Sequence, residues 1–132
     1  MKAKDEMMTT LRHLALDRKA VLMMQEDISH IEEDIKKEPP AVQREALEET
    51  HARLMSSMVV TKHHIDRIER LLSLLSSDER EVLEQMVINP YPEVVFDLGE
   101  ELGLEPASIY RLRARALDKL TRLRYGAGAN VK

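Results

Sequence analysis

The sequence contains no cysteine and very few aromatic residues. Among its 132 residues there are no Trp, one Phe and three Tyr, so that aromatics make up only 3%. Without Cys there can be no disulfide and no thiolate metal site, and a large compact core usually contains more aromatic volume than this. Long apolar runs are also missing, because no stretch approaches the roughly 20 residues that a membrane-spanning helix needs.

The N-terminal stretch MKAKDEMMTT has early acidic residues and no apolar segment typical of a signal peptide. We therefore expect a soluble, cytoplasmic protein with no membrane contact, from a bacterium or a phage. One residue in three is charged (33%), the net charge is −4, and Leu, Ile, Val and Met supply the apolar content. Such a composition is typical of long amphipathic helices, and no segment has a strand pattern. The composition and pattern predict an all-α fold.

Two long helices are predicted in the first 75 residues. Between residues 7 and 35, and again from 41 to about 75, apolar residues recur at steps of three and four, as in a coiled coil. Glu38-Pro39-Pro40 separates the helices, because the residue before a proline avoids the α-conformation. The first seam consists of Leu14, Val21, Met24, Ile28, Ile31 and Ile35, with Asp17 as an interruption; the second consists of Leu47, Leu54, Met58, Thr61, Ile65, Ile68, Leu72 and Leu75.

Each of these helices would be about 50 Å long at 1.5 Å per residue. Joined by a short proline turn, they are expected to fold back as a helical hairpin over residues 1–75. A two-helix hairpin has too small a core to be stable alone. We therefore predict that the N-terminal helices associate with a second copy, so that the protein is a homo-oligomer, or pack on the C-terminal part.

A C-terminal domain is predicted over residues 76–126. Ser76 and Glu79 form a capping-box pattern before the apolar stripe of the next helix. The sequence NPYP ends that helix, and two further helices are expected from Pro92 to Leu102 and from Pro106 to Tyr125. Residues 127–132 read as a flexible tail. The apolar stripe of the first of these helices contains Val82, Leu83, Met86 and Val87.

The spacing of small and apolar residues from Val95 onwards is typical of a helix-turn-helix. Gly99 is expected where the two helices cross, and Gly103 where the first helix ends with positive φ. Leu104 is expected to fill the turn, and Pro106 to start the second helix. The other apolar positions of the pattern are Leu98, Leu102, Ile109 and Leu112.

The last predicted helix separates apolar from basic residues at 100° per residue. Six basic residues and one acid, Asp118, lie between Pro106 and Tyr125. Because a polyanion is attracted to such a face, the pattern favours binding to double-stranded DNA. The predicted buried side contains Ile109, Leu112, Ala116, Leu120 and Leu123; the opposite side contains Ala107, Tyr110, Arg111, Ala114, Arg115 and Arg122.

The segment LSSDEREVLEQMV…VVFDLGEELGLEPASIYRLRARALDKL resembles region four of bacterial sigma factors, the part that recognises the promoter −35 element. The ending ALDKLTRLRYG and the preceding helices are similar to the ArpU and RinA families of phage regulators. The resemblance covers about residues 74–126. It implies a sequence-specific regulator of transcription, encoded by a phage or prophage, with RNA polymerase as a further partner. It also implies that Pro106, Ala107, Tyr110 and Arg111 read bases.

With the basic residues further along the helix, the candidate DNA-binding residues are Pro106, Ala107, Tyr110, Arg111, Arg115, Lys119 and Arg122. This prediction requires that Tyr110, Arg111 and Arg115 stay accessible and are not covered by the N-terminal helices.

Two other functions are compatible with the same pattern. One is a phage terminase small subunit, which also joins a helix-turn-helix to a helical oligomerisation region. The other is a coiled-coil adaptor that docks on RNA polymerase without touching DNA. An enzyme is not expected, because the acidic pairs lack a nucleophile, an oxyanion site and a pocket pattern. No metal or other cofactor is expected either, since the adjacent His63 and His64 point about 100° apart on a helix.

Overall fold

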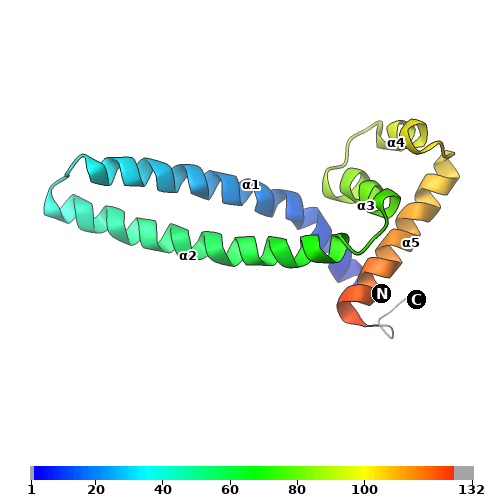
Figure 1. The fold of residues 1–132 in the computed structure, drawn as a ribbon, viewed down its shortest axis with the longest axis horizontal. Helices are drawn as coiled ribbons and strands as arrows, with labels where there is room; N and C mark the ends of the chain where they lie inside the picture. The colour runs from blue at the N-terminus through cyan, green and yellow to red at the C-terminus, as the bar shows by residue number, and fades with distance from the viewer. Residues whose placement is uncertain (1, 127–132) are drawn as a thin grey trace. The chain divides into compact units, whose positions relative to one another are not determined.

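A computed structural model of the chain describes residues 2–126, and these are all-helical with no strand among them (Figure 1). The prediction of an all-α fold is confirmed for these residues. The tail predicted for residues 127–132 lies outside the described residues. The elements are α1 (Lys2–Lys36), α2 (Ala41–Leu72), α3 (Ser77–Leu83), the π-helical turn η1 (Glu84–Ile88), α4 (Val94–Leu102) and α5 (Pro106–Tyr125).

The contacts divide the chain into two compact units. Leu16–Asp66 forms one unit, called the hairpin below. The described residues up to Ala15 and from Arg67 onwards form the other, called the C-terminal unit. The predicted domain boundary lay between residues 75 and 76. The prediction therefore assigned the first turns of α1 and the end of α2 to the hairpin, whereas the contacts group them with the C-terminal unit.

In the hairpin, α1 and α2 run antiparallel on either side of the turn at Glu38, which has a φ of 53° (Figure 1). The Nε2 atom of His51 lies 3.0 Å from Oε2 of Glu32, and that of His64 lies 3.7 Å from Oδ2 of Asp17. These two contacts set the register, so that residues whose numbers add up to about 82 lie at the same level.

The hairpin buries few of its apolar residues completely. Val21, Ile28 and Ile65 are buried, whereas Met24 and Met58 are only half-buried although both belong to the predicted seams. Two helices cannot surround a side chain on all sides, so the seam stays partly open to solvent.

The predicted capping box begins α3. The backbone N–H of Glu79 donates to Oγ of Ser76 at 3.2 Å, and the backbone N–H of Ser76 donates to Oε1 of Glu79 at 2.8 Å. The helix then widens into η1, where the N–H of Asn89 donates to the carbonyl of Glu84 at 2.9 Å. Helix α2 ends at Leu72, three residues before the predicted end, and the buried Leu75 lies in the connection to α3.

Helices α3, α4 and α5 share one apolar core in the C-terminal unit. It consists of Val82, Val94, Leu98, Ile109 and Leu112, with Met86, Val95 and Leu102 packed against it. These residues include most of the apolar positions predicted for the last two helices.

Two positions predicted to be apolar and buried are exposed. Leu104, expected to fill the turn, is 36% exposed, because the turn runs over the surface just after α4 ends. Leu123 is 42% exposed, because α3 starts opposite Lys119 and does not reach the next turn of α5. Thr121, which sequence periodicity did not select, is buried instead and donates its hydroxyl to the carbonyl of Leu117 at 2.7 Å.

The turn between α4 and α5 depends on two glycines. Gly103 has φ 68° and ψ 36°, the left-handed conformation that was predicted for it and that a residue without Cβ adopts without strain. The N–H groups of Gly103 and Leu104 both bond to the carbonyl of Gly99. A Cβ on Gly99 would lie 2.9 Å from the carbonyl oxygen of Leu104. The constraint on Gly99 is therefore the backbone of the turn, not the crossing helix that the sequence pattern suggested.

We expect Gly99→Ala to lower the free energy of unfolding by about 1–3 kcal/mol, as overpacked sites do. Helix propensity alone predicts the opposite, a gain of about 1 kcal/mol. Urea unfolding followed by circular dichroism measures the difference, and a more stable variant would contradict the close approach. At Gly103, Asn should be better tolerated than Ala, because Asn adopts the left-handed conformation more readily.

Candidate nucleic-acid interface

One face of the first two turns of helix α5 is open to solvent, while Ile109 and Leu112 on the opposite face are buried. Its N-cap residue, Glu105, has extended backbone (φ −77°, ψ 159°), and Pro106 occupies the first turn, where its missing N–H is harmless. The side chains of Pro106, Ala107 and Arg111 are exposed, and Tyr110 is 52% exposed. All four positions to which the resemblance assigns base contacts are thus accessible.

The basic residues of this face differ in how strongly they are engaged within the protein. Arg111 donates to Oγ of Ser108 at 2.9 Å, one turn back on the same helix. Arg115 and Arg122 are exposed, and neither forms an ion pair with another described residue. Their guanidinium groups are therefore available to an anion.

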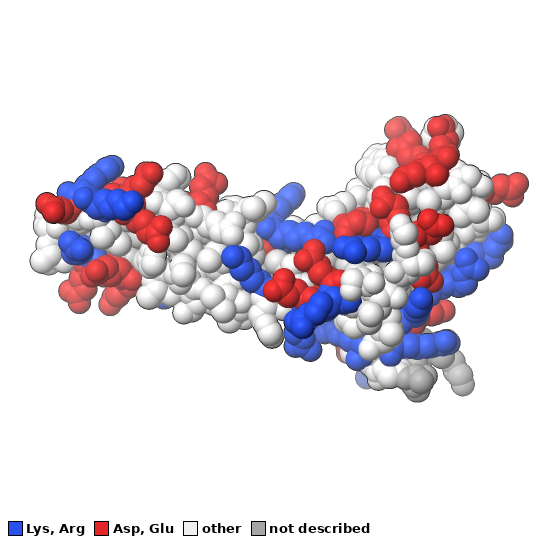
Figure 2. Space-filling view, in the orientation of Figure 1, with Lys and Arg blue, Asp and Glu red and all other residues white. Residues whose placement is uncertain are grey.

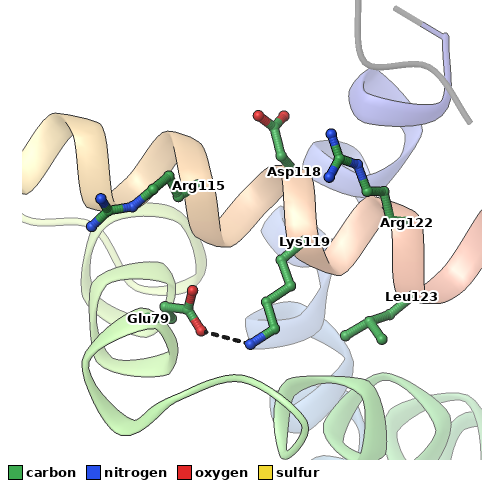
Figure 3. Close-up of a pocket in the computed structure, with 6 residues that line it drawn as sticks. All are labelled: Glu79, Arg115, Asp118, Lys119, Arg122 and Leu123. Atoms are coloured by element: carbon green, nitrogen blue, oxygen red, sulfur yellow. Dashed lines mark hydrogen bonds and ion pairs between the residues drawn. The ribbon is translucent and has the colours of Figure 1, made fainter. Parts of the chain in front are cut away.

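Lys119 is instead paired within the unit. Its Nζ atom lies 3.3 Å from Oε1 of Glu79, the capping residue of α3 (Figure 3). The hydrogen bond from the backbone of Ser76 holds the pKa of the Glu79 carboxyl below its usual value, and Lys119 lowers this pKa further, although partial burial opposes both. The carboxylate of Glu79 thus compensates part of the charge of Lys119.

A shallow depression of about 550 Å³ lies beside this ion pair. Figure 3 shows Lys119 pointing towards Glu79, while the carboxylate of Asp118 points to the other side of α5. Three basic side chains and two acidic ones border the depression, which makes it a mixed rather than a purely cationic pocket. Its lining residues are Glu79, Arg115, Asp118, Lys119, Arg122 and Leu123.

The first turns of α1 contact the second half of α5. The ammonium of Lys4 lies 2.7 Å from Oδ1 of Asp118, an oxygen shielded from water, and Arg124 donates to Oγ1 of Thr10 at 3.3 Å. Sequence reasoning missed Lys4 because nothing local marks it, and it compensates the one acid on the basic face. The N-terminal residues therefore flank the far half of α5, and Tyr110, Arg111 and Arg115 remain exposed.

The two last helices carry opposite charges. Figure 2 shows acidic side chains over α4 and basic side chains along α5. A polyanion is therefore attracted to the exposed face of α5 and repelled from α4. The acids from the start of α4 to the turn are Glu93, Asp97, Glu100, Glu101 and Glu105.

Within residues 2–126, no group of three or more His, Asp and Glu side chains is arranged to hold a metal ion. His64 contacts Asp17 and is not directed at a shared site with His63. None of the helices in this range has the length and apolarity required to cross a bilayer.

No family model, curated protein or solved structure matches this chain. The resemblance to sigma region four therefore depends on the quoted residues alone, and the site must be judged by its own geometry.

Glu79→Gln should destabilise the protein in a pH-dependent way. Because the folded pKa of Glu79 is depressed, its contribution is present above about pH 4.5 and is lost as the pH falls through the folded value. Glutamine keeps a capping hydrogen bond but removes the charge, so we expect a loss of about 0.5 kcal/mol at pH 7 that is smaller at pH 3. Urea unfolding at both pH values tests this, with the exposed Glu100→Gln as control. An equal loss at both values would contradict the electrostatic role.

Proposed function

We propose that this protein is a sequence-specific, duplex-DNA-binding regulator of transcription that resembles sigma region four and is encoded by a phage or prophage. The observation that supports this most directly is the exposed face of the first half of α5, where Tyr110, Arg111 and Arg115 are accessible while the opposite face packs against α3 and α4. In a helix-turn-helix, α5 would be the recognition helix.

The dimensions and chemistry of α5 suit a major groove, which is wide enough to admit one helix. Arg111 lies where it can form two hydrogen bonds to a guanine edge, and Tyr110 and Ala107 lie beside it on the same exposed face. Arg115 and Arg122, one and three turns further on, are placed to bind phosphates. Lys119 would bind a phosphate more weakly, because its ammonium is already paired with the carboxylate of Glu79.

The acidic residues restrict how DNA can approach. Five acids between Glu93 and Glu105, with no Lys or Arg among them, would repel phosphates from α4 and the turn. In this proposal the duplex lies against α5 on the side away from α4. The ion pair between Lys4 and Asp118 removes most of the repulsion that a lone aspartate would cause in the middle of the basic face.

The remaining parts of the proposal follow from the sequence analysis. The protein acts by binding rather than by catalysis and needs no cofactor. It associates with itself through the N-terminal helices, and RNA polymerase is a further partner. Two copies would present two recognition helices, and linkage of the second binding event to the first raises the overall affinity through effective concentration.

Replacing Arg111 and Arg115 together by alanine should weaken duplex binding and flatten its salt dependence. Each lost phosphate contact reduces the slope of log K against log salt by about 0.9, so the loss of two contacts should reduce it by about 1.8. Fluorescence anisotropy with a labelled duplex at several salt concentrations measures both effects. Arg53→Ala, which replaces an exposed arginine of α2 in the hairpin, is the matched control. Equal binding by the double variant and the control would count against the site.

Asp118→Asn should strengthen DNA binding. The substitution removes a negative charge from the basic face and frees the ammonium of Lys4. We expect a severalfold higher affinity at low salt and a salt slope steeper by about 1. The loss of the ion pair should cost less than about 1 kcal/mol of stability. Asp34→Asn, near the hairpin turn, is the control, and an unchanged or weaker affinity of Asp118→Asn would contradict the proposed approach of DNA.

A further inference from the structure

The middle of the hairpin is free of charge on both helices. One residue in three is charged in the whole chain, yet residues 20–25 of α1 and residues 54–61 of α2 contain no Asp, Glu, Lys or Arg. In the register set by the two histidine contacts, these runs overlap at the same level. Figure 2 shows the result as an uncharged stretch between the charged tip of the hairpin and the charges further along it. We call this stretch the belt.

Large apolar side chains of the belt point into solvent. The exposed fractions are 64% for Leu22, 65% for Met23, 60% for Val59, 69% for Val60 and 38% for Met55. Single exposed apolar residues are ordinary, but a contiguous group of them marks an interaction surface. The inward residues of the same level are already used within the hairpin, so these outward ones are available only to a partner.

The exposed residues belong to two flanks of the hairpin. In an antiparallel pair, the second helix runs opposite to the first, and the side that it turns towards its partner also points the opposite way. Residues that directly follow an inward residue therefore lie on one flank of both helices, and residues that directly precede one lie on the other. Leu22, Met55 and Val59 follow inward residues and define the first flank. Met23 and Val60 precede inward residues and define the second flank.

The charges of the first flank are arranged symmetrically about the belt. Lys62 and Glu48 both follow inward residues, and they stand seven residues, two helical turns, on either side of Met55. If a second hairpin packed here in the opposite direction, with a two-fold axis near Met55, Lys62 of each copy would lie opposite Glu48 of the other. Val59 would then lie at the level of His51 of the other copy, next to the small Ala52.

The wider charge distribution favours the same orientation. Between Glu26 and Arg53, which includes the tip, nine acidic residues stand against four basic ones. In the rest of the hairpin, Arg18, Lys19 and Lys62 outnumber Asp17 and Asp66. A parallel pair would place two acidic tips together, whereas an antiparallel pair places each tip against the less acidic end of its partner.

We propose that the flank carrying Leu22, Met55 and Val59 is the surface on which a second copy of this chain binds, antiparallel to the first. This inference deepens the proposed self-association by naming its surface and its direction. It does not require DNA binding, because none of its residues lies in the C-terminal unit. The two hairpins form a four-helix arrangement in which the belts cover each other.

Two adjacent valines provide a matched test of the surface. Val59→Lys places a charge in the proposed interface, whereas Val60→Lys places one on the other flank at a residue of similar exposure. Sedimentation equilibrium of the full chain should show a dimer for the wild type and for Val60→Lys, and a dissociation constant raised at least tenfold for Val59→Lys. Circular dichroism establishes that both variants keep their helices.

A charge exchange tests the direction. Lys62→Glu alone and Glu48→Lys alone should each weaken the dimer about tenfold, because like charges then face each other. The double variant should regain most of the lost affinity in an antiparallel dimer. In a parallel dimer Lys62 would face Lys62 and Glu48 would face Glu48, so the double exchange would rescue nothing.

A wild-type chain that stays monomeric at high micromolar concentration would overturn the inference, and so would dissociation by Val60→Lys instead of Val59→Lys. A larger assembly that both valine variants disrupt would also overturn it, since that result requires both flanks. DNA binding is read separately by anisotropy. A dimer without DNA affinity contradicts the proposed function alone, and DNA affinity in a monomer contradicts this inference alone.

Discussion

The burial of one side of α5 is the constraint on which the C-terminal unit depends. Ile109, Ala116 and Leu120 on this helix are completely inaccessible to solvent. Helices α3 and α4 cover the first part of α5, and the first turns of α1 contact its second half through Lys4 and Thr10. Because the apolar residues of α5 are buried by these contacts, its basic residues are left on the side that faces solvent. The exposed basic face is the consequence of the packing on the other side.

Glu79 connects this packing to the start of α3. Its carboxylate accepts the backbone N–H of Ser76 and also receives Lys119 from α5. One side chain thus caps the first turn of α3, where backbone N–H groups lack partners within the helix, and also links α3 to α5. The pKa of the carboxyl is lowered by both contacts. The same charge that stabilises the cap reduces what Lys119 can offer to an external anion, so the stability of the unit and the basic character of its surface oppose each other here.

Local patterns predicted the helices and the turn because these depend on nearby residues. The capping box at Ser76, the positive φ of Gly103 and the burial of Ile109 and Leu112 all follow from spacings of a few positions. The errors have a different origin. Leu104 and Leu123 fit the apolar period but extend beyond the reach of the neighbouring helices. The helical period of the sequence was sufficient to distinguish the buried from the exposed side of α5. It could not predict the partners of Lys119 and Asp118, because Lys119 contacts a residue 40 positions away and Asp118 contacts one at the opposite end of the chain.

The hairpin uses its apolar residues in a different way from the C-terminal unit. In the C-terminal unit they converge on one core. In the hairpin only three apolar residues are buried, each with 6–8% of its surface still exposed, and other large apolar side chains point into solvent. A pair of helices with so little enclosed surface gains little stability from its own contacts. Covering the belt with a second hairpin would bury Leu22, Met55 and Val59 and would stabilise the fold by mass action, so that folding of the hairpin and dimer formation become linked. The DNA affinity of such a protein would then depend on its concentration in two ways, through the number of recognition helices in one assembly and through the fraction of chains whose hairpins are paired.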